Sequence, residues 1–218
     1  MSAHPNPVRS ILVAFALVLP LAGCSGILTN KTPTQIIAPQ VQVEPDPSWP
    51  QVAWQLTVMH PGASDMLDSR RMAVMPAPGR IEVYKGVAWE DAVPDIVQDA
   101  VVEAFEDSGK IIAVGHQTSG LNTDFALQLD IRDYQAVYHD AGAPPDVTVT
   151  INARLIDYVT SRAIASRTFR QVVPASGTGV PAVAHAFDSA LAATIHDLVG
   201  WTLSNGQQAK ENAATATH

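Results

Sequence analysis

Residues 147–155 read VTVTINARL, so that apolar side chains alternate with polar ones along the whole segment. Residues 127–132, LQLDIR, follow the same period of two. This alternation is typical of strands that bury one face and expose the other. Turn residues at 141–144 join the two segments, and a third strand is expected at about 163–173. The three segments predict an antiparallel meander with one face in water.

Two further segments repeat their apolar residues at helical spacing. The first covers residues 93–105, with Asp91 as a candidate cap, Pro94 in the first turn and Gly109 after the last turn. The second follows the loop at 175–179, and its apolar face consists of Val183, Ala184, Phe187, Leu191, Ile195, Leu198 and Thr202. Each helix therefore has a single stripe to bury.

Shorter apolar runs complete the pattern and are interpreted as strands. They lie at residues 54–59, 72–75, 81–84 and 111–114. Combined with the meander and the helices, they predict an α+β fold, in which a mainly antiparallel sheet has two helices packed on one face.

The first 24 residues have the pattern of a lipoprotein signal. The apolar run Ile11–Leu19 is too short to span a bilayer, which needs about 20 apolar residues. It leads into LAGC at residues 21–24, where small side chains allow a signal peptidase to bind the backbone. Cys24 is the only cysteine of the chain, and its thiol is available for acylation. We therefore expect cleavage between Gly23 and Cys24, with lipid attached to Cys24.

These features divide the chain into four parts. Residues 1–23 are the expected signal peptide, and the proline-rich residues 24–50 are the expected lipidated tether. Residues 51–205 would form the folded domain, and residues 206–218 are predicted to be a disordered tail. Ser25 stands where an aspartate would resemble an inner-membrane retention signal. In a Gram-negative cell this favours an anchor in the outer membrane, facing the periplasm.

The charge of the chain is acidic, with a formal net charge of −8. This argues against a nucleic-acid partner, because neutralising phosphates requires a basic patch. On the first predicted helix, Asp95, Asp99, Glu103 and Asp107 recur every four residues without an intervening lysine or arginine. Two interpretations stay open: a helix face in water, or a docking surface for a basic partner.

Arg80, Tyr84 and Trp89 gather in the segment that enters the first helix. Arginine and aromatic side chains often anchor protein contacts, but a tryptophan before a helix equally often fills a core. Both interpretations are kept. Together with Asp95, Asp99 and Glu103, these three are the candidate partner-binding residues.

No catalytic, metal or cofactor site is predicted, and the chain is not expected to be an enzyme. His185 and His196 share a face of the second helix, but eleven helical residues separate them by about 16 Å, too far to share one ion. Carboxylates in a regular exposed stripe also lack the burial that tunes a catalytic pKa.

Several short motifs between residues 50 and 203 point to one family. They are RMAVMP at 71–76, Tyr84, Trp89, AFEDSG at 104–109 and the segment 187–191. With the lipobox, they resemble the ABC-type transport auxiliary lipoproteins, the PqiC-like group. The resemblance covers essentially the whole predicted domain.

This resemblance implies a periplasmic component of a transport system of the mammalian-cell-entry (MCE) type. In such systems an ABC permease and ATPase work with an MCE-domain protein to move phospholipid or other apolar molecules across the envelope. The lipoprotein would dock or receive the trans-periplasmic component, and a homo-oligomer would suit that role. The alternative is a structural or assembly lipoprotein of the outer membrane that does not handle lipid. An apolar groove on the sheet would favour lipid handling, whereas a fully covered sheet would favour docking alone.

Overall fold

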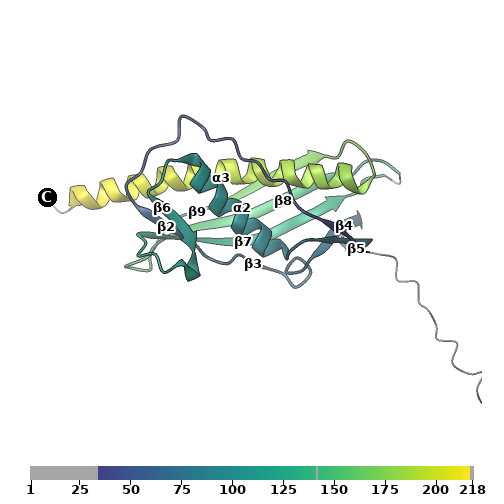
Figure 1. Cartoon of the computed structure of the whole chain (residues 1–218), viewed down its shortest axis with the longest axis horizontal. Coiled ribbons are helices and arrows are strands. Elements are labelled where there is room, and N and C mark those ends of the chain that lie inside the picture. Colours follow the sequence, from purple (N-terminus) through teal and green to yellow (C-terminus); the bar gives the residue numbers. More distant parts are fainter. Residues whose placement is uncertain (1–33, 141, 217–218) are drawn as a thin grey trace, which may run out of the picture. The chain divides into compact units, whose positions relative to one another are not determined.

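The longest strand, β7 (Phe125–Val137), lies at the centre of the sheet (Figure 1). The structure is a computed structural model that describes residues 34–140 and 142–216. Within this part, nine strands and two α-helices form an α+β fold. The predicted signal peptide, its cleavage site at Gly23 and Cys24, and the first part of the tether lie outside the described residues.

On one side of β7 the chain forms the predicted antiparallel meander. Strand β8 (Asp146–Asp157) pairs with β7, and β9 (Ala163–Pro174) pairs with β8. The register places Leu127 opposite Leu155, and Ile151 opposite Phe169. These apolar residues are buried on the same face of the sheet, as the period of two predicts.

On the other side of β7, three short strands follow one another along the same edge. They are β2 (Gln55–Val58), β3 (Gly62–Ala63) and β4 (Arg71–Ala77), and all three run parallel to β7. The sheet is therefore mixed rather than mainly antiparallel. The reason is topological: the chain leaves this edge and returns to β7 through a helix, the kind of crossover that joins parallel strands.

Strand β5 (Arg80–Trp89) forms a hairpin with β4. Strand β6 (Ala113–His116) runs parallel to β2 and leads into a short 3-10 helix, η1 (Gln117–Ser119).

The segment before residue 51 belongs to the fold as well. Strand β1 (Gln35–Ile37) pairs with β5, and Trp49 is buried. In the stretch between β1 and Trp49, Val41 and Val43 pack against the core. The prediction of a tether up to residue 50 is therefore wrong for residues 34–50. Their apolar side chains, spaced between prolines, supply enough buried surface to hold an extended segment in place.

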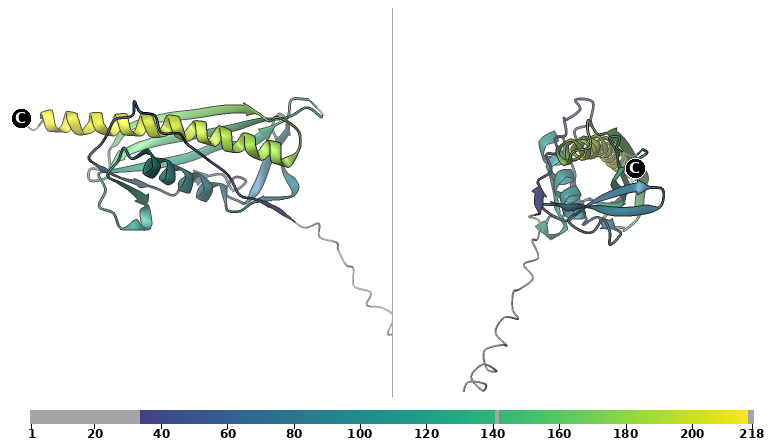
Figure 2. Two further views of the ribbon diagram at one scale, coloured as in Figure 1. Left: turned by 45° about the horizontal axis from the view of Figure 1, so that its top comes forward. Right: turned by 90° about the vertical axis from the view of Figure 1, so that its right-hand side faces the viewer.

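The two helices, α2 (Val93–Ser108) and α3 (Val180–Ala216), lie on one side of the sheet (Figure 2). Helix α2 packs on β2, β6 and α3, whereas α3 packs on β7, β8 and β9. The N-cap of α2 is Ala92, without a side-chain cap, so Asp91 does not have the predicted role. Gly109 ends the helix as predicted, in the left-handed region at φ 59°. No helix in the described part of the chain is long and apolar enough to cross a membrane.

Helix α3 continues to Ala216, where the composition suggested a disordered tail from residue 206. The glycine that suggested an end to the helix has a packing role instead. A Cβ atom on Gly206 would lie 2.5 Å from Cζ2 of Trp54, so the glycine lets the buried indole approach the helix backbone. Farther along the helix, the Lys210 ammonium donates a hydrogen bond to the carboxylate of Asp124, the residue directly before β7.

Aromatic side chains fill the space between the sheet and the helices. Trp89 of β5, Tyr134 of β7 and Phe187 of α3 form one cluster, with ring centroids 4.8–5.9 Å apart. Trp54 packs edge-on against Phe125 at 5.1 Å. All five are nearly inaccessible to solvent, so these residues belong to a continuous packed core.

Candidate partner-docking surface

Helix α2 separates its apolar residues from its charged ones. Val93, Val97 and Phe105 face the core and are essentially inaccessible. The opposite side is exposed and acidic. Residues 90–107 contain seven carboxylates and no lysine or arginine. The acidic face consists of Glu90, Asp91, Asp95, Asp99, Glu103, Glu106 and Asp107.

The segment 38–45, which we call the strap, passes beside this face. The Glu90 amide donates to the Ile37 carbonyl at 2.9 Å, which fixes the beginning of the strap next to α2. The Gln40 amide donates to a carboxylate oxygen of Asp188 on α3 at 3.1 Å. Burial raises the pKa of Asp188, while this hydrogen bond opposes the shift. The strap is therefore hydrogen-bonded to α3, and its beginning is held next to the segment that leads into α2.

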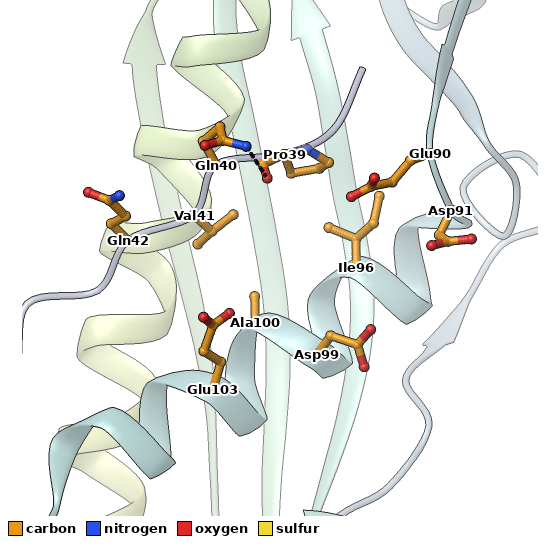
Figure 3. Close-up of a pocket in the computed structure, with 10 residues that line it drawn as sticks. All are labelled: Pro39, Gln40, Val41, Gln42, Glu90, Asp91, Ile96, Asp99, Ala100 and Glu103. Carbon is orange, nitrogen blue, oxygen red and sulfur yellow. Dashed lines mark hydrogen bonds between the residues drawn. The ribbon is translucent and has the colours of Figure 1, made fainter. Parts of the chain in front are cut away.

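A groove runs between the strap and α2. Its first section has a volume of about 330 Å³, and its second section, toward Pro45 and Asp107, about 480 Å³. Both sections share Val41 and Glu103 as lining residues. In Figure 3, Ile96 and Ala100 point from α2 toward the strap, with the carboxylates on the α2 side and at the end near Glu90. The groove thus combines a small apolar base with an acidic rim along α2.

Two histidines from other elements face the acidic side chains of α2. His60 Nε2 lies 3.2 Å from Asp95 Oδ1, and His116 Nε2 lies 3.5 Å from Asp99 Oδ1. Each contact becomes an ion pair only when the imidazole is protonated. Among the described residues, no lysine or arginine forms an ion pair with the acidic face, and Glu103 has no ion-pair partner at all. The rim therefore has a negative charge that the domain itself does not neutralise.

The six candidate partner-binding residues do not form one site. Asp95, Asp99 and Glu103 share the exposed face of α2, as their spacing predicts. Arg80 is exposed at the turn between β4 and β5 and pairs with Glu82 at 3.0 Å. These two groups lie on different elements and are not brought together.

Tyr84 and Trp89 of β5 have structural roles. The hydroxyl groups of Tyr84 and Tyr138 are 2.6 Å apart, and burial followed by this hydrogen bond raises the pKa of Tyr84. Trp89 is 0 % exposed, so the interpretation as a core residue holds and a partner cannot reach its side chain.

The strap and the two histidines were not predicted as parts of this surface. Val41 and Val43 alternate with polar residues, which is a weak strand-like signal that the surrounding prolines obscured. His60 and His116 lie far from α2 in sequence, and no pattern connects them to it. The described residues contain no group of three or more histidine, cysteine, aspartate or glutamate side chains suited to a metal ion.

Comparisons with known proteins place this geometry in a wider context. The family model described as ABC-type transport auxiliary lipoprotein component matches residues 35–199. A crystal structure of a Xanthomonas campestris protein is 43 % identical, with a TM-score of 0.78, and the match covers 82 % of this chain and 99 % of that one.

Two other matches are more distant. The crystal structure of an uncharacterized protein has a TM-score of 0.60 at 11 % identity, over 76 % of this chain and 97 % of that one, and so shares the fold. An uncharacterized protein of Bradyrhizobium diazoefficiens is 26 % identical over 186 residues, or 84 % of this chain. The match covers only 49 % of that curated relative, so this chain spans about half its length.

Proposed function

The chain belongs to the family of ABC-type transport auxiliary lipoprotein components, and from this premise we propose that it serves an MCE-type transport system. In this proposal it is the lipid-anchored periplasmic subunit of a system that moves phospholipid or other apolar molecules across the envelope. Its partners are the MCE-domain protein and the ABC permease and ATPase. The family is one of auxiliary transport components rather than of enzymes.

The anchor in this proposal is acylated Cys24, exposed by cleavage after Gly23. The lipobox and the serine at position 25 support an outer-membrane location. Two or more acyl chains give a lasting anchor, because each buried methylene contributes about 0.8 kcal/mol.

The packed interior supports a docking role for this subunit. Aromatic rings occupy the space between sheet and helices, and the two sections of the strap groove lie on the surface. A phospholipid acyl chain needs a long apolar cavity, and the groove instead has carboxylates along its rim. We infer that this subunit holds a protein partner, while another component encloses the lipid.

The observation that carries the docking proposal is the uncompensated acidic face of α2 beside a mostly polar groove with a small apolar floor. A basic segment of the partner would satisfy the carboxylates, and its apolar side chains would cover Ile96 and Ala100. Charge complementarity of this kind raises association rates and selects partners more than it adds affinity. The contact should therefore weaken as the salt concentration rises.

Co-purification from cell envelopes tests the proposal. Wild type should retain the MCE-domain protein and its permease, and the Asp99→Lys/Glu103→Lys variant should lose most of both. The matched control is Asp140→Lys/Glu211→Lys, which reverses two exposed charges in the turn between β7 and β8 and near the end of α3. Equal retention by both variants would reject the acidic face as the docking surface. Recovery of outer-membrane assembly proteins alone would replace the transport role by the structural one.

A further inference from the structure

The hairpin of β8 and β9 is basic although the chain is acidic. Residues 146–174 contain four arginines and two aspartates. Both aspartates are engaged: Asp146 pairs with His139 at 3.0 Å, and Asp157 accepts a hydrogen bond from the Thr160 amide at 2.7 Å. The arginines have no ion-pair partner in the described part of the chain. They are Arg154, Arg162, Arg167 and Arg170.

The same hairpin exposes large apolar side chains. In the described residues, seven large hydrophobic side chains are strongly exposed, and four of them belong to this hairpin. Val159 and Tyr158 in the turn are 86 % and 51 % exposed, and Ile164 and Val172 are exposed on β9. Tyr158, Val159 and Ile164 lie at or next to the turn together with Arg162, whereas Val172 lies toward the other end of β9. Exposed apolar residues beside a basic one are typical of contact surfaces.

Strand β9 is also an edge of the sheet. It pairs with β8 alone among the described strands, while α3 packs against its inner face. Its outer edge therefore presents backbone N–H and C=O groups over 12 residues. Such groups need water or polar headgroups as partners and cannot enter a hydrocarbon layer.

From these three observations we propose that the β8–β9 hairpin is a membrane-contact surface that binds anionic phospholipid headgroups. Arg154, Arg162 and Arg170 contact the phosphates, whereas Arg167 lies on the inner face with its guanidinium 4.9 Å from the centre of the Phe169 ring. Strand β9 lies at headgroup level, where its free edge keeps polar partners. Only the turn at Tyr158 and Val159 reaches the boundary of the acyl chains, a depth that suits a tyrosine ring. This contact acts in addition to the proposed lipid anchor. It depends on that anchor only because the anchor holds the domain near the bilayer.

The location of this surface makes it independent of the strap groove. Helix α2 packs on β2, β6 and α3, whereas β9 packs on β8 and α3. The two surfaces also differ in sign, since one is lined by carboxylates and the other by arginines. A bilayer with negative charge therefore attracts the hairpin and repels α2, which leaves α2 free for a protein.

A fluorescent probe at the turn tests this proposal in the whole lipoprotein. Because Cys24 is the only native cysteine, a Val159→Cys variant of the acylated chain can be labelled at one position with a polarity-sensitive dye. It is reconstituted in vesicles of phosphatidylethanolamine with phosphatidylglycerol, or of phosphatidylcholine alone. Ile81→Cys is the control, because Ile81 is 43 % exposed on β5, outside the hairpin.

In the anionic vesicles the probe at position 159 should shift to the blue and be quenched by brominated acyl chains. The probe at position 81 should do neither. Changing Arg154, Arg162 and Arg170 to glutamine should lower the docking equilibrium about fivefold per arginine. The control substitutions Arg71→Gln and Lys85→Gln should leave the docking equilibrium unchanged.

Three results would overturn the proposal: an aqueous spectrum at position 159 in both vesicles, an equal response of both probes, or shielding that appears only when the MCE-domain protein is added. The last would make the hairpin a protein-docking surface. Thermal melts monitored by circular dichroism establish that each labelled variant is folded. Co-purification of transport partners is scored separately, so a failed transport role and a failed membrane contact give different results.

Discussion

Gly206→Ala is the substitution that most directly tests the packing of helix α3. In an ordinary helix interior, replacing glycine by alanine stabilises a protein by about 1 kcal/mol. Here the added Cβ would lie 2.5 Å from Cζ2 and 3.0 Å from Cε2 of Trp54. The indole is 2 % exposed and packs edge-on against Phe125, so it cannot move aside without losing contacts.

Overpacking in a core costs about 1–3 kcal/mol, and a contact this close belongs in the upper part of that range. After the gain in helix propensity is subtracted, Gly206→Ala should lower the free energy of unfolding by up to about 2 kcal/mol. In a Trp54→Phe background the smaller ring leaves room for the methyl group. There the same change should stabilise, giving a coupling energy of about 2–3 kcal/mol between the two positions.

Urea unfolding of the four proteins of this cycle gives the coupling energy, and Gln208→Ala serves as an exposed control on the same helix. Its effect should be limited to a few tenths of a kcal/mol. If Gly206→Ala stabilises equally in both backgrounds, or has no effect in either, residues 206–216 do not pack as a helix against Trp54.

Three further substitutions test other parts of the molecule. Trp89→Ala should lower the free energy of unfolding by about 3–5 kcal/mol in chemical denaturation, because it removes a fully buried ring. A variant that stays stable but no longer binds its partner would show instead that Trp89 is a contact residue. Tyr84→Phe should cost about 1 kcal/mol at neutral pH, through loss of the bond to Tyr138. Since the folded state raises the pKa of Tyr84, the wild-type advantage should shrink as pH rises above about 10, which denaturation at several pH values will measure. Burial raises the pKa of Asp124, but the hydrogen bond from Lys210 outweighs this effect, so the pKa is lowered. Above pH about 4, Lys210→Ala should lower the free energy of unfolding by at most about 1 kcal/mol. Thermal melts should show this difference vanish as the pH falls through the lowered pKa.

The parts of the fold that could be predicted are those where one short stretch determines its own structure. Residues 147–155 alternate because one face of β8 packs into the core, and that alternation is visible without knowledge of the neighbours. The expected exposure of the other face is wrong for Thr148 and Thr150, which are also buried. Helix α2 likewise has its apolar stripe, its proline at the first turn and its Gly109 end within one segment. In both cases the local period and the tertiary contacts agree.

The errors arise where distant residues decide the outcome. Strand direction in β2 to β4 depends on the crossover to β7, which four or five apolar residues do not encode. Gly206 resembles a helix end until Trp54, about 150 residues earlier, fills the space beside it. The prolines of the strap predict a tether because they are visible in the sequence, whereas the core against which Val41 packs is not.

The candidate site follows the same division. Spacing alone placed Asp95, Asp99 and Glu103 on one helix face, since a helix is a local structure. It gave no information on whether cations from elsewhere neutralise that face. The contribution of His60 and His116, and the groove beside the strap, required the packing of α2 against other elements.

The order of elements along the chain has a consequence for the timing of folding. Every described strand precedes α3, yet α3 covers the inner face of β8 and β9. Until residues 183–203 emerge from the ribosome, Leu155 and Phe169 have no helix to pack against, so the nascent chain cannot close its core. This order suits the export that we propose. A precursor that cannot close its core during synthesis stays unfolded and can be threaded through a translocation channel.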